Sequence, residues 1–196
     1  MGEAAYQTTV RETPWIELID GKVFMMSPRP RTTHADVVSN ITTIFNNYLW
    51  DKPCKAYSDG VDVFLDEKNR FVPDAMIVCN RDIIHIDGIH GAPDLVVEVL
   101  SHSTAQHDRG KKMEAYARAG VKEYWIVAPL ERTIEVYLQK DGRLVLDAVY
   151  NDVPAWELER MEPEDRAEVR SDIKVSLYDD FIVHASDVFH KMDFDF

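Results

Sequence analysis

The six residues Leu95-Val96-Val97-Glu98-Val99-Leu100 decide the fold, because they put apolar side chains on both faces of one short strand. Side chains alternate between the two faces of a strand, so a strand that is apolar on both faces has to be covered on both. Such strands lie at the centre of a sheet against which helices pack. The sequence therefore predicts an α/β protein with this segment as a central strand.

On the N-terminal side of this strand, the pattern predicts a hairpin, a helix and two strands. Residues 15–26 alternate around Asp20-Gly21, a pair favoured in two-residue turns. Apolar residues at helical spacing over residues 37–48 predict a helix that Thr33 can cap. Two strands are expected at residues 61–65 and 71–78.

On the C-terminal side, a second helix runs from about residue 104 to 119 and stops at Gly120, a residue favoured just beyond a helix end. Ser101 and Ser103 lack the flanking glycines of a nucleophile motif and can cap this helix. Strands are expected at residues 123–127, 133–138, 143–149 and 173–177. This order of elements predicts an α/β fold with a mixed β-sheet core flanked by helices.

The length of 196 residues fits one domain, and 45% hydrophobic residues are enough to form its core. We expect a single domain over residues 1–196 with an acidic C-terminal extension from about residue 151. The extension carries 13 acidic and five basic residues. We expect it to cover an edge of the sheet or a partner subunit.

The chain contains two cysteines, Cys54 and Cys79, which are too few for a disulfide scaffold or a thiolate zinc site. This favours a reducing compartment. No run approaches the roughly 18 apolar residues of a membrane span, and the N-terminus does not resemble a signal peptide. We therefore expect a cytoplasmic protein that does not enter a membrane.

The formal net charge of −13 repels polyanions, which argues against a protein that coats nucleic acid. Residues 105–122 reverse the balance, with five basic and two acidic residues. A local site for an anionic partner is therefore restricted to this one basic patch.

Glu98 interrupts the central strand, and an ionised carboxylate buried without a partner costs several kcal/mol. Asp74 interrupts the apolar residues 71–78 in the same way. If the two strands are neighbours, these acids lie within about 5 Å of each other, where a divalent cation relieves their repulsion. Oxygen ligands favour Mg²⁺ or Mn²⁺. Two simpler interpretations stay open: Glu98 pairs with a buried base, and Asp74 is a turn residue after Pro73.

Lys112 lies beside the apolar stripe of the second helix, one turn after Asp108 and one turn before Tyr116. Lys111 is turned about 100° away from that stripe. A lysine close to two metal-bound carboxylates can position water and offset the charge of a phosphate. The alternative is an Asp108–Lys112 surface pair worth a few tenths of a kcal/mol, roughly.

Four segments together resemble a known family: Val72-Pro73-Asp74, then Pro93-Asp94-Leu95-Val96-Val97-Glu98-Val99-Leu100-Ser101, then Asp108, Lys112 and Tyr116, then Gly120-Val121-Lys122-Glu123-Tyr124-Trp125-Ile126-Val127. From about residue 15 to 150 the chain is similar to the Uma-type putative restriction endonucleases of the PD-(D/E)XK nuclease superfamily. The resemblance implies a restriction-endonuclease-like fold and a Mg²⁺- or Mn²⁺-dependent endonuclease that hydrolyses DNA phosphodiester bonds.

The resemblance also implies which residues do this chemistry. Asp74 and Glu98 correspond to the two acids of the motif and would be the metal ligands, with Lys112 as the third catalytic residue. The motif places its lysine two residues after the second acid, where this chain has Leu100, so Lys112 on the following helix has to substitute for it. The candidate accessory residues are Glu17, His34, Ser101, Asp108 and Tyr116.

DNA is the partner that the resemblance implies, through Arg109, Lys111 and Lys112 of the basic patch. On an acidic body this binding is expected to be weak and salt-dependent, and a homodimer that brings two patches together fits better than a monomer. Two other functions stay open. One is a non-catalytic oligomeric binding or scaffold protein that keeps the nuclease fold, which the charge of −13 and Leu100 favour. The other is a metal-dependent hydrolase of small phosphoesters.

Overall fold

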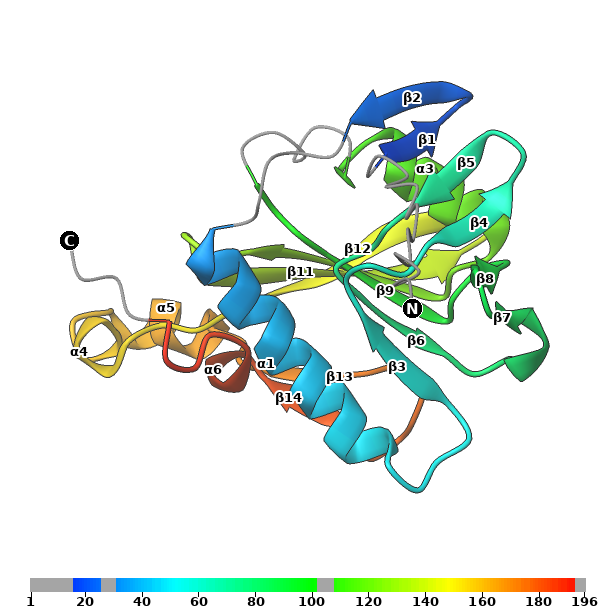
Figure 1. Cartoon of the computed structure of the whole chain (residues 1–196). Coiled ribbons are helices and arrows are strands. Elements are labelled where there is room, and N and C mark those ends of the chain that lie inside the picture. The colour runs from blue at the N-terminus through cyan, green and yellow to red at the C-terminus, as the bar shows by residue number, and fades with distance from the viewer. Residues whose placement is uncertain (1–15, 26–30, 102–107, 193–196) are drawn as a thin grey trace, which may run out of the picture.

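The computed structural model describes residues 16–25, 31–101 and 108–192. Its strands form two six-stranded sheets and a separate two-stranded hairpin. One sheet has the order β12-β11-β10-β9-β6-β3 and the other the order β2-β1-β5-β4-β8-β7 (Figure 1). Helices pack against the first sheet, so the prediction of an α/β fold with a mixed β-sheet core is confirmed.

The central strand lies where the sequence predicts it. In β9 (Leu95–Val99) every residue is buried. It pairs in parallel with β10 (Glu123–Ala128) and antiparallel with β6 (Ala75–Val78). The side chains of Leu95, Val97 and Val99 enter one core cluster, and that of Val96 enters another on the opposite face.

The N-terminal elements also follow the predicted order. The hairpin of β1 (Ile16–Ile19) and β2 (Lys22–Met25) turns at Asp20-Gly21, and α1 (Thr32–Leu49) comes next. The predicted cap Thr33 is wrong, because Thr33 lies inside the first turn and Arg31 stands at the cap position without a side-chain hydrogen bond. The helix depends on its apolar face, which packs on the first sheet.

Residues 71–78 form two strands instead of the one predicted. β5 (Asn69–Phe71) belongs to the second sheet and β6 to the first, and the chain crosses between them at Val72-Pro73-Asp74. Proline has no N–H to donate to a strand ladder, so the pairing stops there. β4 (Val63–Asp66) is close to its predicted range, whereas three short strands were not predicted: β3 (Lys55–Ser58), β7 (Ile84–His85) and β8 (Gly88–His90).

The second predicted helix is shorter than expected. α3 (Lys111–Ala119) begins after Gly110, whose non-helical backbone (φ −122°, ψ −110°) separates it from Asp108. The predicted start near residue 104 and the predicted cap Ser103 lie outside the described residues. The helix ends at Gly120 as predicted, since Gly120 adopts the left-handed conformation with φ +102°.

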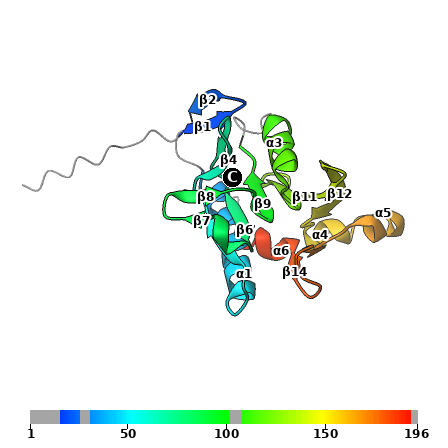
Figure 2. The same cartoon turned by 90° about the vertical axis from the view of Figure 1, so that its right-hand side faces the viewer.

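The rest of the chain forms an antiparallel meander followed by the acidic extension. β11 (Thr133–Lys140) pairs with β10 and with β12 (Arg143–Asn151), close to the predicted ranges. The extension contains α4 (Ala155–Leu158), α5 (Pro163–Glu168), β13 (Asp172–Lys174), β14 (Ile182–His184) and α6 (Ala185–Val188). Figure 2 shows α4 and α5 projecting from the body of the molecule, next to β12.

The end of the extension is part of the main core. Ile173, Phe181 and Val188 pack in the same cluster as Phe45 of α1 and Trp125 of β10. This segment therefore covers a face of the first sheet together with α1, rather than an edge. α3 and the β1–β2 hairpin lie on the other side of that sheet (Figure 1).

A buried acid links the extension to the sheet. Glu123 is fully buried, and its carboxylate accepts hydrogen bonds from Trp125 Nε1 at 2.6 Å and from the Ser176 amide at 2.7 Å. Burial raises the pKa of Glu123, which these hydrogen bonds oppose. The carboxylate thus ties the loop after β13 to the start of β10.

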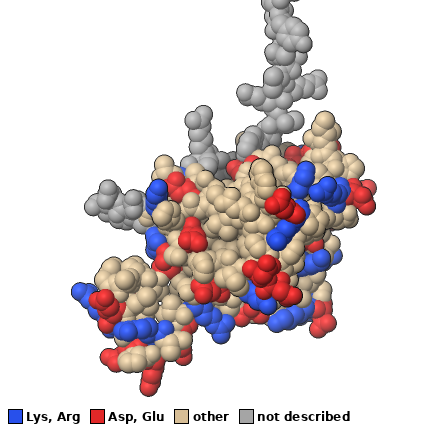
Figure 3. Space-filling model, turned by 90° about the horizontal axis from the view of Figure 1, so that it is seen from below, with Lys and Arg blue, Asp and Glu red and all other residues tan. Residues whose placement is uncertain are grey.

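The acidic and basic side chains are mixed over the surface. On the face seen in Figure 3 they form small interspersed groups, and no continuous basic area is visible there. Among the described residues no helix is long and apolar enough to cross a membrane.

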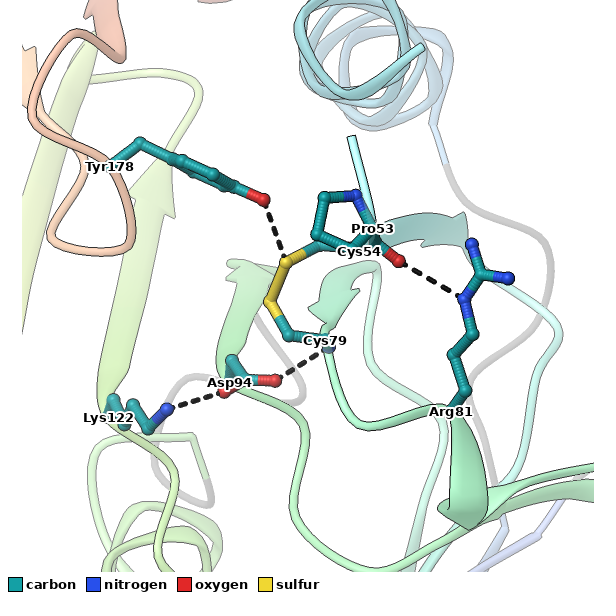
Figure 4. The surroundings of a disulfide bond; sticks show 7 residues. All are labelled: Pro53, Cys54, Cys79, Arg81, Asp94, Lys122 and Tyr178. Carbon is teal, nitrogen blue, oxygen red and sulfur yellow. Dashed lines mark hydrogen bonds and ion pairs between the residues drawn. A yellow bond between two sulfur atoms is a disulfide. The ribbon is translucent and has the colours of Figure 1, made fainter. Parts of the chain in front are cut away.

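The two cysteines form a disulfide, which the sequence analysis did not anticipate. β3 and β6 are antiparallel with Lys55 opposite Val78, so Cys54 and Cys79 are cross-strand neighbours although 25 residues separate them (Figure 4). Tyr178 Oη donates to Cys54 Sγ at 3.0 Å. The pairing does not support the reducing compartment that was expected, since disulfides are rare there.

At position 88, any residue other than glycine would be strained. Gly88 has φ +146°, and an added Cβ would lie 2.5 Å from the Asp62 carbonyl oxygen and 2.9 Å from the Phe64 ring. We expect Gly88→Ala to lower the free energy of unfolding by about 2 kcal/mol, from backbone strain and the clash. The matched control is Gly142→Ala, where φ is +76° and nothing lies within 4 Å. Thermal melts that show equal losses would contradict this.

Candidate active site

Asp74, in the crossing between β5 and β6, lies next to Glu98 of β9. β6 and β9 pair with Ala75 opposite Val97, so Asp74 and Glu98 come opposite each other at the next position. The Val99 amide donates to Asp74 Oδ2 at 2.6 Å, which fixes the Asp74 carboxylate against β9. Asp74, just before β6, and Glu98, within β9, are thus neighbours whose charges are close enough to interact.

Glu98 points toward α3 and meets Lys112. Lys112 Nζ lies 2.8 Å from Glu98 Oε1, 2.9 Å from Glu17 Oε1 and 3.4 Å from Asp108 Oδ1. Only 3% of the Lys112 side chain is exposed. We call Glu17, Glu98, Asp108 and Lys112 the Lys112 cluster. The interpretation of Asp108–Lys112 as a surface pair is wrong, and Glu98 does pair with a buried base.

Three different segments hold the Lys112 cluster together. Glu17 comes from β1, and its Oε1 also accepts a hydrogen bond from the Val72 amide at 3.1 Å. Lys112 comes from the first turn of α3, and Asp108 precedes that helix. The β1–β2 hairpin is thereby tied to the loop that carries Asp74.

Aromatic residues surround the cluster. Tyr116, one turn after Lys112, donates from its Oη to Glu98 Oε1 at 3.1 Å. The Phe71 ring packs against Tyr116, and Tyr124 Oη donates to the Asp108 carbonyl oxygen at 2.9 Å. Both tyrosines are fully buried. The charges of the cluster therefore lie in a medium of low dielectric constant, where unbalanced charge is costly.

The cluster has more acids than bases, with three carboxylates around one ammonium group. Burial raises the pKa of Glu98 well above its usual range, and repulsion from Asp108, Asp74 and Glu17 adds to this against the opposing charge of Lys112. Burial alone would lower the pKa of Lys112, but the surrounding carboxylates outweigh it and raise that pKa well above its usual value. The Lys112 ammonium and the carboxylates around it therefore form one coupled group of charges, in which Lys112 offsets the repulsion among the acids.

His34 adds a second base on the side of Asp74. His34 Nε2 lies 3.2 Å from Asp74 Oδ1. Burial lowers the pKa of His34, but the hydrogen bond and charge of Asp74 outweigh this and raise it above its ordinary value. His34 also lines a groove of about 380 Å³ between α1 and the end of β3, which gives solvent a route to this end of the site.

The structure changes the interpretation of the basic patch. Arg109 pairs with Glu135, Lys111 with Asp20 and Lys122 with Asp94. Lys112 is buried, so its assignment as a residue on a DNA-contacting surface is wrong. The charge excess counted along residues 105–122 is neutralised by acids that are distant in the sequence.

Ser101 and Asp59 lie near the Asp74 end of the site. Ser101 follows β9 and is partly buried. Asp59, which the sequence analysis did not select, lies in the groove beside His34 and is close enough to Asp74 for their charges to interact. A single acid in Ser58-Asp59-Gly60 looks like an ordinary turn residue, so the sequence offers no signal for it.

Asp74 and Glu98 are the candidate protein ligands for a divalent metal ion. Among the described residues, no three His, Cys, Asp or Glu side chains are grouped so that they could hold a metal. Mg²⁺ often takes one or two carboxylates and keeps several of its waters, and Asp74 and Glu98 are two neighbouring carboxylates. The surplus of buried acid favours a cation at this place.

Comparisons with known proteins agree with this fold. The family model described as "Uma2: Putative restriction endonuclease" matches residues 4–170, further than the range of 15–150 expected from the resemblance. The uncharacterized protein slr1290 of Synechocystis sp. (strain ATCC 27184 / PCC 6803 / Kazusa) is 26% identical over 157 residues, which are 79% of this chain and 76% of that protein.

A solved structure shows the same architecture. The crystal structure of a putative nuclease belonging to DUF820 from Anabaena variabilis ATCC 29413 superimposes with a TM-score of 0.62 and 20% identity. The match covers 90% of both chains. At this level of identity the likeness concerns the fold.

Proposed function

The chain belongs to the Uma2 family of putative restriction endonucleases, and we propose that it is a metal-dependent endonuclease that hydrolyses DNA phosphodiester bonds. The observation that carries this proposal is the placement of Asp74, Glu98 and Lys112. Asp74 precedes β6 and is hydrogen-bonded to β9 one residue after Glu98, and the lysine reaches Glu98 from α3 instead of from position 100. This proximity supports assigning Asp74, Glu98 and Lys112 to the three groups of the nuclease motif.

In this proposal Asp74 and Glu98 hold Mg²⁺ or Mn²⁺. When bound, the ion would supply positive charge that lowers the pKa of a water molecule and stabilises the leaving oxygen of the phosphodiester. The Val99 amide and His34 orient Asp74, and Lys112 and Tyr116 orient Glu98. The protein residues therefore keep both carboxylates in place before the ion arrives.

In this proposal Lys112 serves mainly to position and neutralise the carboxylates around it. Its ammonium group has three carboxylate partners, Glu17, Glu98 and Asp108, which occupy its N–H groups. It positions Glu98 and offsets the charge of the acids, and it reaches a phosphate only if one of these contacts opens. His34 lines the groove beside α1, and in this proposal its proton is donated to a phosphate oxygen bound there.

The test is cleavage of plasmid and single-stranded DNA with Mg²⁺ or Mn²⁺. We expect cleavage that stops in chelator, and calorimetric Mn²⁺ binding by the same protein. Lys111→Ala is the control, since Lys111 is half-exposed and pairs with Asp20 on the surface, and it should change the rate little. DNA affinity should be weak and should fall with added salt.

A non-catalytic scaffold is the second candidate function. The full pairing of Lys112 and the neutralised basic patch favour it, because neither leaves free positive charge for a phosphate. Failure to cleave either DNA in Mn²⁺, together with absent Mn²⁺ binding, would contradict the nuclease proposal and favour the scaffold. Cleavage of small phosphoesters without cleavage of DNA would favour the hydrolase of small phosphoesters.

A further inference from the structure

The outer edge of β12 is an unpaired strand edge over most of its length. The Gln139 amide donates to the Lys122 carbonyl oxygen, so the backbone of Gln139 faces β10. Its partner Leu144 on β12 therefore directs its N–H and C=O away from β11, and Leu146, opposite Tyr137, does the same. Among the described residues, only Asn151 uses this edge, by donating to the Arg170 carbonyl oxygen at 2.7 Å.

Apolar side chains accompany this open edge. Val145, Leu146 and Val149 are 41%, 48% and 39% exposed. β12 is nine residues long, and Figure 2 places it at the outer side of the sheet. Long apolar edges of this kind invite pairing with another strand, and proteins usually protect them with charges or proline. The opposite edge, β3, is four residues long and carries Lys55.

We propose that β12 pairs antiparallel with β12 of a second copy of the chain, which joins two six-stranded sheets into one. A two-fold axis at Val145 sets Val145 against itself and Leu144 against Leu146 of the partner subunit. The outward N–H and C=O groups of both leucines then bond across the interface. Arg143 comes opposite Asp147 of the partner subunit, and symmetry makes this pair twice.

Charge complementarity selects this register. A two-fold axis at Leu144 sets Arg143 against Val145 of the partner subunit, and one at Leu146 sets Val145 against Asp147 of the partner subunit. Only the axis at Val145 puts the two charged residues of the open edge opposite each other. Within one chain, Lys140 Nζ lies 3.9 Å from Asp147 Oδ1. This exposed ion pair is weak, so it competes little with the Arg143–Asp147 pair across the interface.

The test is the oligomeric state of the full chain by sedimentation velocity up to about 100 µM. We expect a dimer for the wild type. Arg143→Asp and Asp147→Arg should each weaken it at least about tenfold, because each puts two pairs of like charges in register. The double variant Arg143→Asp/Asp147→Arg restores opposite charges and should restore the dimer. Val145→Lys, which sets two ammonium groups on the axis, should give a monomer.

A control keeps the result specific. Lys174 and Asp179 form another exposed pair at 3.9 Å, so Lys174→Asp/Asp179→Lys should leave the dimer unchanged. Arg143, Val145 and Asp147 are exposed, and circular dichroism spectra should show that all variants are folded. A monomeric wild type, single swaps that dimerise as well as wild type, or a double swap that stays monomeric would each overturn the proposal.

Discussion

Replacing Glu98 by glutamine is expected to lower the rate of DNA cleavage by at least about 100-fold while the protein stays folded. An amide removes the negative charge that a divalent ion needs, but keeps the shape of the side chain and its hydrogen bond with Tyr116. Cleavage should therefore fall with the loss of metal binding and not with the loss of the fold.

The melting temperature of Glu98→Gln distinguishes a metal-binding role of Glu98 from a structural one. The Lys112 cluster has three carboxylates and one ammonium group, so without metal Glu98→Gln should melt at the same temperature or a few degrees higher. Mn²⁺ should stabilise the wild type more than the variant, because it binds the folded state. A large loss of stability that is independent of metal would make Glu98 structural.

The control substitution is Glu123→Gln. Glu123 is also a buried acid in a strand of the first sheet, but its carboxylate binds Trp125 Nε1 and the Ser176 amide, away from Lys112. It should lower stability somewhat and leave the cleavage rate of the folded protein unchanged. A comparable loss of cleavage in Glu123→Gln would show that any buried charge change disturbs the site.

Replacing Lys112 by methionine is expected to have the largest effect on stability, a loss of about 3–5 kcal/mol in the free energy of unfolding. Methionine has a similar volume but no charge, so Glu17, Glu98 and Asp108 would be left buried without their shared base. For a chain of this size the melting temperature should fall by about 10 °C. Denaturant unfolding and thermal melts measure both.

Lys111→Met is the matched control, one residue away on the same helix. Lys111 is half-exposed and pairs with Asp20 at 3.0 Å, so its loss should cost less than about 0.5 kcal/mol. Adding Glu98→Gln to Lys112→Met should recover part of the lost stability, because one unpaired carboxylate is removed. Equal losses in the two lysine variants would contradict the buried ion-pair assignment.

Several elements of the fold could be predicted because their signals are local. The apolar run around Glu98 predicted the central strand, Asp20-Gly21 predicted the first turn, and Gly120 predicted the end of α3. These preferences act over a few residues and so are visible in the sequence. The errors at Pro73 and Gly110 arose where regular spacing was followed across a residue that interrupts it.

The C-terminal extension could not be placed in this way. It was expected to cover an edge of the sheet or a partner subunit, whereas α4 and α5 contain no buried residue. The apolar residues Phe181 and Val188 nevertheless enter the main core, and their partners on α1 are more than 130 residues away, as the Tyr48–Asp180 contact illustrates with a separation of 132. Sequence spacing carries no information about contacts of that range.

For the candidate site, the sequence alone determined that Glu98 and Asp74 are acids within apolar segments and so need partners. The physical reason is the cost of a buried charge, which holds whatever the rest of the chain does. Only the tertiary structure decided that Lys112 is shared among Glu17, Glu98 and Asp108. Glu17 and Lys112 are 95 residues apart in the sequence. They meet because the β1–β2 hairpin, β9 and α3 pack on one another, and the sequence of any one of these segments does not show that packing.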